Sequence, residues 1–471
     1  MDPIQSALDS ALSALARLSP ELRAESDAIS DELSKPPRIV ITGRLKAGKS
    51  TLVNALIGAP VAETATLEAT NAVTAYQYGA PDRAEVVLKT GDRIPVATRR
   101  GEVASLSVPA DEVDFVERWM PAGALRNYTL IDTPGLATLT EANERTTRRA
   151  LGIDGFEQTR EASASADAAV FLFDAVPRAD EIEFVQQLGF TPLNLLGVLS
   201  RADSFGPGAL GAEDPIDAAL AHSSVLLDQL RQFVFRVIPV AGLMAQSAIG
   251  GAVTESFARR VAANREKSPA EIMALVHGPR TPDRDEILEL IEVIGEYGLI
   301  EGRRRVDGGA TELTHWLKER SGVPALEESL HEALGPYARL HRAWRCVERF
   351  ERLVYEHREH GPEIRRLASA LRFDPRMYPV LLLGDLKALL MNGADPEITA
   401  AVFEVCQGTS NGQRLGLSRF ASGFEIIEAV RQKRAKLDGL ALRMLNPAEE
   451  VAVVNLRRAY AELDKAGQLL T

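Results

Sequence analysis

Apolar positions divide the chain into three regions with different periodicities. In residues 1–35 they recur every three or four positions, which predicts helix, and the Ser-Pro-Glu sequence at 19–21 predicts an N-cap that starts a second helix. From residue 38 to residue 242, nearly continuous apolar runs alternate with helical patterns. After residue 251 only the helical periodicity remains.

The apolar runs of the central region have the length and composition of buried strands. They cover residues 39–42, 128–131, 168–173, 195–199 and 235–240. Such runs are typical of a parallel sheet with helices on both faces. Two further runs, 85–88 and 93–97, flank a Lys-Thr-Gly-Asp turn and predict an antiparallel hairpin. The central region is therefore expected to be a doubly wound, mostly parallel α/β domain with antiparallel additions.

The helical segments on either side of this domain are expected to pack together. Those after it cover residues 286–299, 326–354, 396–406, 420–443 and 448–469, with Gly-Pro at 335–336 as a candidate kink. The N-terminal segment cannot bury its apolar stripe alone, and this bundle is its natural partner. We therefore expect N-terminal helices at 1–35, an α/β domain at 36–250 and an α-helical bundle at 251–471, with a stalk built from both chain ends.

Composition and charge favour a globular protein without a nucleic-acid partner. Of the 471 residues, 45% are hydrophobic and 25% are charged, and the net charge of −12 means that the surface as a whole does not attract nucleic acid. The two cysteines, Cys346 and Cys406, lack metal-ligand spacing. The N-terminus lacks a secretory pattern, and no apolar run approaches the roughly 18 residues of a spanning helix. These features predict a cytoplasmic protein.

One motif carries most of the chemical information in the sequence. Residues 43–50 read G-x-x-x-x-G-K-S, directly after the run at 39–42 and before a helical pattern at 51–56. In that context backbone N–H groups surround a polyphosphate, Lys49 reaches the β- and γ-phosphates, and Ser50 ligates Mg²⁺. The residues expected to bind the phosphates are Gly43, Ala47, Gly48, Lys49, Ser50 and Thr51.

A second motif, D-T-P-G at residues 132–135, follows the apolar run at 128–131. A carboxylate at this strand end can hold Mg²⁺ through water, and the Gly135 N–H can meet the γ-phosphate. The loop between the two motifs should supply a threonine hydroxyl to the Mg²⁺ shell. Thr70 is our candidate and Thr66 the alternative, and an ordinary polar loop residue is the other interpretation. The predicted metal ligands are Ser50, Thr70 and Asp132.

A third motif is placed to read the base. Residues 200–203 read S-R-A-D after the run at 195–199, and Asp203 can accept hydrogen bonds from the N1–H and exocyclic amine of guanine, which adenine does not offer. Ser200 and Arg201 depart from the usual N/T-K-x-D form, although the stem of Arg201 can still lie along the base. Gly242 is a candidate for the remaining base-side loop. The expected ligands are GTP and GDP with Mg²⁺.

The predicted catalytic apparatus lacks one familiar group. Leu136 stands where many signalling GTPases have a glutamine that orients the attacking water. Hydrolysis therefore needs another charge-stabilising group, and Lys46 or Arg44 of the phosphate loop can supply it. The alternative for both is a solvated loop cation, which is the favoured interpretation for Arg44. The predicted catalytic set is Lys46, Lys49, Ser50, Thr70, Asp132 and Gly135.

These motifs together resemble those of the bacterial dynamin-like large GTPases, in particular the isoniazid-inducible proteins of mycobacteria and related actinobacteria. The similarity covers residues 45–56, 132–135 and 199–203 and extends to Glu-Arg-Ser-Gly at 319–322 and the helix that follows. The resemblance implies a P-loop GTPase head, a neck formed by both termini and a helical trunk. It also implies a homodimer through the heads or an assembly with a paralogue, and remodelling of membranes from the inner face of the cell membrane.

The resemblance calls for an anionic-lipid contact in the trunk, which the sequence does not mark clearly. Residues 377–391 combine leucines with nearby cations and are the best candidate, although a bundle core helix is the favoured interpretation. A basic cluster at 431–436 is most often a solvated helix face. A row of arginines from Arg339 to Arg352 is expected to pair with acidic residues of the N-terminal helices, namely Asp27, Asp31 and Glu32.

Two other functions compete with membrane remodelling. A regulatory or assembly-factor GTPase would use its helical region to bind a protein instead of lipid. An RNA-associated GTPase is disfavoured by the acidic balance and by the lack of a compact basic domain.

Overall fold

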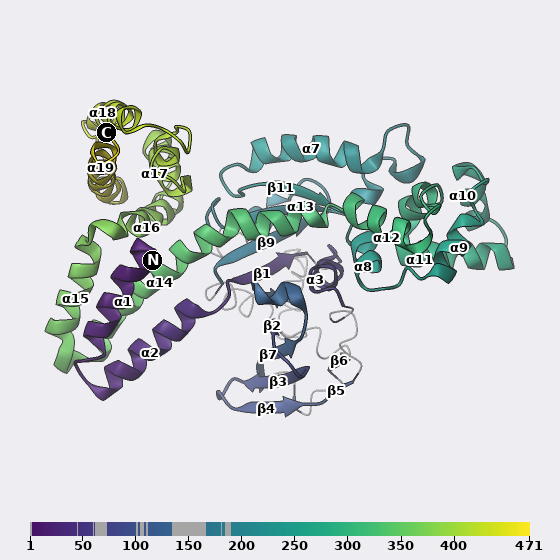
Figure 1. The fold of residues 1–471 in the computed structure, drawn as a ribbon, viewed down its shortest axis with the longest axis horizontal. Helices are drawn as coiled ribbons and strands as arrows, with labels where there is room; N and C mark the ends of the chain where they lie inside the picture. Colours follow the sequence, from purple (N-terminus) through teal and green to yellow (C-terminus); the bar gives the residue numbers. More distant parts are fainter. Residues whose placement is uncertain are drawn as a thin grey trace, which may run out of the picture. The chain divides into compact units, whose positions relative to one another are not determined.

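The chain divides into two compact units. The structure, a computed structural model, describes residues 2–44, 46–59, 61, 73–99, 102–103, 108–109, 112–133, 166–179, 181–183 and 190–471. One unit comprises Pro36–Leu334, and the other combines Met1–Lys35 with Gly335–Thr471 (Figure 1). The N-terminal helices thus share a unit with helices from the far end of the chain.

The Pro36–Leu334 unit is built on a nine-stranded sheet with the order β11-β10-β9-β1-β8-β2-β7-β3-β4. Five strands form a continuous parallel block: β1 (Arg38–Gly43), β8 (Thr129–Asp132), β9 (Ala168–Phe173), β10 (Leu195–Ser200) and β11 (Val237–Val240). The rest of the sheet comprises β2 (Val73–Tyr78), β3 (Arg83–Leu88), β4 (Arg93–Val96) and β7 (Val113–Met120). A separate pair joins β5 (Thr98–Arg99) to β6 (Glu102–Val103).

This sheet confirms the expected doubly wound, mostly parallel P-loop fold. The predicted hairpin is present, because β3 pairs with β4 in antiparallel register. The periodicity did not predict β2 and β7, which pair in parallel with each other. Their side chains alternate between buried and half-exposed positions, so they lack the continuous apolar runs of the central strands.

Eight helices of the same unit can be described. They are α3 (Lys49–Ile57), α7 (Pro215–Leu230), α8 (Gly242–Ile249), α9 (Glu255–Ala262), α10 (Pro269–His277), α11 (Pro282–Gly302), α12 (Gly309–Arg320) and α13 (Val323–Glu328). Short 3-10 turns elsewhere in the described chain span Gly123–Arg126, Ala202–Ser204, Gly208–Leu210, Arg358–His360, Pro375–Met377 and Gln413–Leu415.

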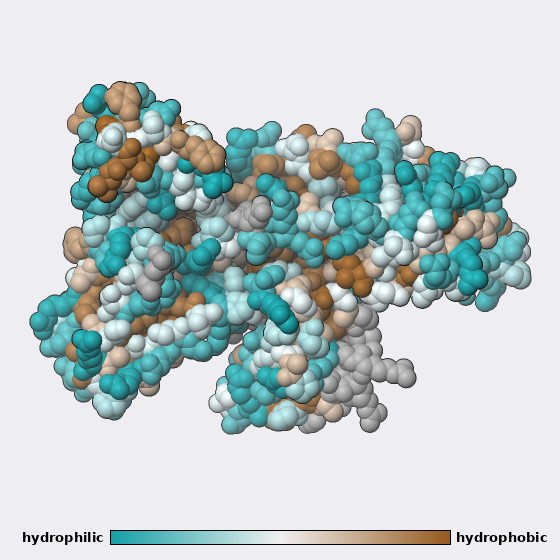
Figure 2. Space-filling model, in the orientation of Figure 1, coloured by the Kyte–Doolittle hydropathy of each residue, from teal (hydrophilic) through white to brown (hydrophobic). Residues whose placement is uncertain are grey.

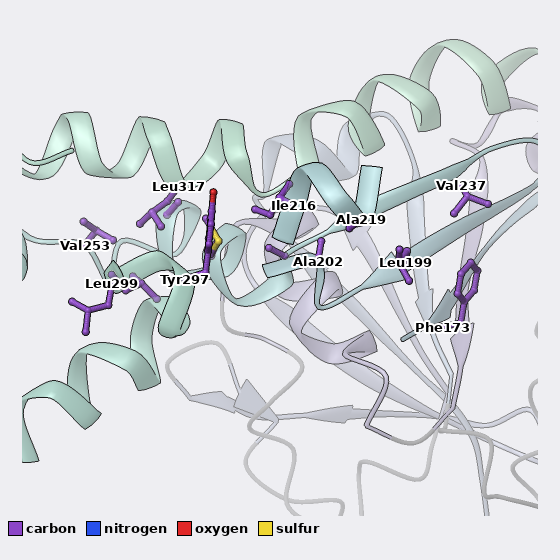
Figure 3. Packing of buried hydrophobic residues seen from close by; sticks show 14 of the residues in the cluster. Phe173, Leu199, Ala202, Ile216, Ala219, Val237, Val253, Tyr297, Leu299 and Leu317 are labelled. Carbon is purple, nitrogen blue, oxygen red and sulfur yellow. The ribbon is translucent and has the colours of Figure 1, made fainter. Parts of the chain in front are cut away.

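The expected boundary at residues 250/251 is wrong. Residues 251–334 belong to the same compact unit as the sheet. Helices α9 to α12 share one hydrophobic core with the strands and α7, and Figure 3 shows Val253 and Leu299 toward one end of this core and Phe173 and Val237 toward the other. An amphipathic stripe shows only that a helix has a buried face, and it does not show whether a sheet or a bundle covers that face.

The predicted long helix exists but contains an irregular turn. Helix α13 is followed by a π-helical turn at Ser329–Ala333 and then by α14 (Leu334–Glu356). Pro336 lacks the N–H that would bond to the carbonyl four residues earlier, and its ring crowds that carbonyl. The π-helical turn just before Pro336 relieves this clash and the lost hydrogen bond.

The second unit is entirely helical in its described part. It contains α1 (Pro3–Leu15), α2 (Pro20–Ser34), α14, α15 (Gly361–Phe373), α16 (Tyr378–Met391), α17 (Pro396–Gln407), α18 (Gly423–Leu440) and α19 (Pro447–Gln468). Ser19 is the N-cap of α2, as the sequence predicts, and its hydroxyl accepts a hydrogen bond from the Leu22 N–H. The apolar stripe of α1 packs against α14 and α15, where Leu8, Leu15 and Phe350 are fully buried. No described helix is both long and apolar enough to cross a membrane.

The lipid interpretation of residues 377–391 is wrong, and the favoured core interpretation is right. This segment forms α16, whose residues Leu382, Leu383, Leu386 and Leu389 have no exposed surface. The basic cluster at 431–436 is largely paired, since Arg431, Lys433 and Lys436 contact Glu428, Glu404 and Glu397. It is therefore a solvated, ion-paired helix face.

The arginines of α14 are also engaged, although with partners other than those expected. Arg349 forms ion pairs with Glu25 and Glu356, each with an N···O distance of 2.8 Å. Arg342 donates to the carbonyl of Lys35. The expected acceptors Asp31 and Glu32 pair instead with the Lys35 ammonium.

Candidate functional site

The phosphate-loop motif adopts the strand–loop–helix arrangement that its sequence predicts. Strand β1 ends at Gly43, and α3 begins at Lys49. Gly43 has φ +150°, and a Cβ there would lie 2.5 Å from the carbonyl oxygen of Leu172 in the neighbouring β9. Gly48 has φ +94° and caps α3 in the left-handed region. The close backbone at Gly43 and the positive φ at Gly48 both favour glycine, so each glycine of the motif has a structural reason.

The ammonium of Lys49 lies inside this loop. Its Nζ donates to the carbonyl oxygens of Gly43 at 3.1 Å and Arg44 at 3.0 Å. Burial lowers the pKa of Lys49, while the charge of Asp132 opposes that shift. The ammonium is thus held by weak acceptors that a phosphate oxygen, with a full charge, can replace.

Asp132 stands at the end of β8, beside β1 in parallel register with Ile41 opposite it. Burial raises its pKa to about 6, and the opposing influences are the Lys49 charge and the backbone N–H of Thr133. Its Oδ1 is buried and has no hydrogen-bond partner among the described residues. The next side chain, Thr133, fixes the strand end by donating to the Ile41 carbonyl at 2.8 Å.

A magnesium ion fits this donor set. A buried carboxylate oxygen without a partner is a costly arrangement unless something polar or charged completes it. Mg²⁺ prefers oxygen ligands and is usually held by one or two protein groups together with phosphates and water. Asp132, with the Ser50 hydroxyl at the first turn of α3, offers that chemistry.

The predicted base-reading motif lies at the end of β10, close in space to the phosphate loop. Arg201 adopts left-handed backbone angles with φ +56°, and its Nη2 donates to the carbonyl oxygen of Lys46 at 2.7 Å. Asp203 follows in a 3-10 turn and is half-buried. Burial raises its pKa, its own backbone N–H and Arg201 act in the opposite direction, and Glu296 raises it further.

Helices α8 and α11 border this side of the site. A Cβ on Gly242, the first residue of α8, would lie 3.3 Å from the Cγ2 of Thr51 in α3, so the two predicted site residues are neighbours. A Cβ on Gly295 in α11 would lie 3.2 Å from the Oδ2 of Asp203. The N–H of Ala241 donates to the Ser321 carbonyl at 2.8 Å. The structure therefore gathers Gly43, Ala47, Gly48, Lys49, Ser50, Thr51, Asp132, Ser200, Arg201, Asp203 and Gly242 at the carboxyl edge of the parallel strands.

The two candidate cations of the loop differ in their surroundings. Lys46 is exposed and has left-handed backbone angles with φ +66°. Arg44 is mostly buried, with its Nε 3.7 Å from the Oε1 of Glu181. Arg44 is therefore an ion-paired residue and not a solvated cation. Thr66, Thr70, Gly135 and Leu136 lie outside the described residues.

Sequence reasoning missed the contribution of α11 and α12. Tyr297 donates its hydroxyl to Asp214 Oδ2 at 2.6 Å, and Arg320 contacts Tyr297, Asp214 and Asp217. This network joins α11 and α12 to the start of α7. Two residues of the Glu-Arg-Ser-Gly sequence at 319–322 make these contacts: Arg320 binds Asp214 and Asp217 at the start of α7, and the carbonyl of Ser321 accepts from the N–H of Ala241, next to Gly242.

Comparison with known proteins agrees with this geometry. The family described as 50S ribosome-binding GTPase matches residues 38–196. The described part of residues 38–196 has the strand–loop–helix arrangement of a P-loop domain, and its sequence is similar to that of this GTPase family. The isoniazid-induced protein IniC of Mycobacterium tuberculosis is 34% identical over 312 residues, which cover 61% of this chain and 60% of IniC. IniA of the same organism is 33% identical over 118 residues, or 22% of this chain and 17% of IniA. The predicted resemblance to the isoniazid-inducible proteins is confirmed.

The matched region extends beyond the GTPase domain but leaves part of each relative uncovered. The chain spans 60% of the length of IniC. Two solved structures of an oligomerised bacterial dynamin pair align with 99% of this chain and with 73% and 74% of theirs, at 13% identity and a TM-score of 0.30.

Proposed function

We propose that this protein binds GTP and hydrolyses it to GDP with Mg²⁺. Lys49 would bind the β- and γ-phosphate oxygens, while Ser50 ligates the metal and Asp132 holds it through water. Mg²⁺ would supply charge neutralisation on the β- and γ-phosphates. Thr70 is proposed as the further metal ligand and Gly135 as the donor to the γ-phosphate.

One observation carries this proposal. The Lys49 ammonium and the Asp132 carboxylate lie at the ends of two adjacent parallel strands, the first on replaceable carbonyl acceptors and the second with a buried oxygen that lacks a partner. A site of this kind is prepared for a ligand that brings both anionic oxygens and a cation. A nucleoside triphosphate with Mg²⁺ brings both.

Guanine selection is assigned to Asp203. Its carboxylate would accept the N1–H and the exocyclic amine of guanine. Because the carboxylate is half-buried and burial already raises its pKa, a base that leaves it unpaired would bind more weakly.

Stabilisation of the negative charge that develops in the transition state of hydrolysis is assigned to Lys46. Arg44 is held by Glu181, whereas Lys46 is exposed at the loop and its backbone is fixed by Arg201. A cation inside the phosphate loop can stabilise the transition state as an arginine finger does.

The test uses the full chain with Lys49→Ala, and Lys89→Ala as the matched control. Lys89 is an exposed lysine of the β3–β4 hairpin in the same unit. We expect Lys49→Ala to abolish phosphate release from GTP and to weaken GDP binding, while Lys89→Ala behaves as the wild type. Normal turnover by Lys49→Ala would show that the site is wrongly assigned.

We further propose that the GTPase cycle is coupled to dimerisation of the heads, through a second copy or a paralogue, and to peripheral binding at the inner face of the cell membrane. The resemblance of four separate motifs to the dynamin-like proteins supports this. The helical unit also presents exposed apolar side chains, seen as brown patches over α17 to α19 in Figure 2. Leu442 and Met444, in the turn between α18 and α19, are 89% and 101% exposed.

Apolar insertion, and not charge, is the contact that these residues favour. Arg443, which lies between Leu442 and Met444, is already paired with Asp395 and Glu397. The affinity for vesicles should therefore change little with salt concentration, and vesicles that contain anionic lipid should still bind. The test is co-sedimentation with anionic and with zwitterionic vesicles, for the wild type and for Leu442→Ser/Met444→Ser. Lack of any vesicle binding by the wild type would favour the regulatory, protein-binding alternative.

A further inference from the structure

Helix α11 breaks its regular geometry at the residue that lies against Asp203. Gly295 has φ +76° and ψ 168°, which are not helical angles, although helix continues on both sides of it. A Cβ at this position would lie 3.2 Å from the Oδ2 of Asp203 and 3.9 Å from the Cδ2 of Leu243 in α8. Two separate constraints thus favour glycine, namely the backbone angles and the space occupied by a carboxylate.

The break is held in place from both sides. Before it, the Ser247 hydroxyl of α8 donates to the carbonyl of Val293. After it, the Tyr297 hydroxyl donates to Asp214 at 2.6 Å, and Arg320 of α12 contacts the same carboxylate at 2.8 Å. Three elements therefore fix where the backbone of Gly295 meets Asp203, and none of the contacts depends on a bound ligand.

We propose that Gly295 is a positioning residue that sets the Asp203 carboxylate for bidentate recognition of guanine. This rests on the proposed function. The backbone at Gly295 bounds the carboxylate on one side, because a Cβ there would lie 3.2 Å from the Asp203 Oδ2, and it thereby limits the orientations that the carboxylate can adopt. The positioning element comes from a helix outside residues 38–196, the part of the chain that matches the GTPase family.

A purely structural role for the break makes a different prediction. If Gly295 only allowed α11 to pack, a substitution would weaken the binding of every nucleotide by a similar factor. If it sets the carboxylate, the loss should be greatest for a base that donates two hydrogen bonds. Guanine offers N1–H and an amine, whereas hypoxanthine offers N1–H alone, so the ratio of GDP to IDP affinity separates the two roles.

The experiment measures GDP, IDP and ADP binding to the full chain by calorimetry. We expect Gly295→Ala and Asp203→Ala each to lower the GDP-to-IDP affinity ratio by about tenfold. Gly251→Ala is the matched control, because Gly251 has φ +75° and nothing lies within 4 Å of a Cβ there. It places an alanine at nearly the same positive φ in the same unit, with no neighbour close to the added Cβ, and should leave the ratio unchanged.

An unchanged ratio in Gly295→Ala, or equal losses for GDP and IDP, would overturn the proposal. A wild type that prefers ADP, or binds no guanine nucleotide, would instead refute the proposed function itself. Where Gly295→Ala does not fold, Tyr297→Phe decides the question, since it removes only the hydroxyl that anchors the break to Asp214. The ratio should then fall by a smaller factor, and a wild-type ratio in that variant counts against the proposal.

Discussion

The Nη2 of Arg201 donates to the carbonyl oxygen of Lys46 at a distance of 2.7 Å. The first residue belongs to the base motif and the second to the phosphate loop, and both have left-handed backbone angles although neither is glycine. Such angles are sparsely populated by non-glycine residues and persist only where the surroundings enforce them. The hydrogen bond therefore joins two strained turns, one in the phosphate loop and one in the predicted base-reading motif.

Removing this bond should speed nucleotide release. We expect Arg201→Ala to raise the dissociation rate of GDP by about tenfold, because the loss of one charge-assisted hydrogen bond frees the loop to open. Arg201→Lys restores a cation and should retain most of the wild-type rate. Stopped-flow measurement with a fluorescent GDP analogue reports the rate directly. The control is Arg231→Ala, which removes an exposed arginine paired with Asp228, and an equal effect in that variant would contradict the assignment.

Asp132 should show opposite effects on stability and on function. Its pKa is raised to about 6 by burial, so at neutral pH the folded protein without metal holds a carboxylate in an unfavourable environment. Asp132→Asn removes that charge and should stabilise the metal-free protein by about 1–2 kcal/mol. The same variant should need far more Mg²⁺ for half-maximal GTP hydrolysis, because the amide is a poor magnesium ligand.

Thermal unfolding in chelator and a magnesium titration of turnover measure the two effects of Asp132→Asn. Asp174→Asn is the matched control, since Asp174 directly follows the parallel strand β9 of the same sheet but is exposed. We expect neither quantity to change in the control. A loss of metal-free stability in Asp132→Asn would show that the carboxylate is a structural group.

The sequence predicted the strand–loop–helix arrangement around Lys49 well and the surroundings of Asp203 only in part. The strand, loop and helix around Gly43 and Lys49 are contiguous in the chain, so the spacing of residues in the motif is enough to predict how they are arranged. Asp203 was also predicted, because it follows a buried strand whose carboxyl end must lie at the same edge of the sheet. The place of Gly295 beside Asp203 was not predicted. The two residues are 92 positions apart in the chain, and the periodicity of the helix that contains Gly295 does not specify what that helix packs against.

The fold shows the same division between local and long-range information. The N-cap at Ser19 and the β3–β4 hairpin depend on residues within a few positions of each other, and both were predicted. The assignment of residues 251–334 to the sheet unit depends on which surface buries Leu290 and Leu317, and hydrophobic periodicity does not specify the partner surface. The same holds for Arg349: an acidic partner on the N-terminal helices was predicted, but the partner is Glu25 and not one of the predicted residues.

Gly322 should be intolerant of any side chain. It has φ +78°, and a Cβ would lie 2.1 Å from the carbonyl oxygen of Pro239 at the end of β11. Because that neighbour is backbone, it cannot move aside as a flexible side chain would. We expect Gly322→Ala to lower the free energy of unfolding by about 2–4 kcal/mol in denaturant titration. Gly91→Ala, with φ +89° and open space around it, reports the backbone strain alone and should cost about 1 kcal/mol. Equal losses in the two variants would contradict the steric argument.

The helical unit should lose stability as the pH rises, because of one buried carboxylate. Burial raises the pKa of Asp385 in α16 to about 6, against the opposing effects of the Asn455 hydrogen bond at 2.8 Å and the Arg372 charge. A carboxyl whose folded pKa lies above its unfolded value of 3.8 stabilises the fold when protonated. That contribution is complete below the unfolded pKa and is lost as the pH rises through about 6.

Asp385→Asn tests this pH dependence, because the amide can still accept from Asn455 but does not ionise. We expect it to stabilise the protein by about 1–3 kcal/mol at pH 7.5 and by much less at pH 4.5, in denaturant titrations at both values. The control Asp438→Asn removes an exposed carboxylate of α18 that pairs with Arg457 and should show no comparable pH dependence. If Asp385→Asn is destabilising at pH 7.5, the ionised carboxylate contributes a favourable interaction that outweighs the cost of its burial.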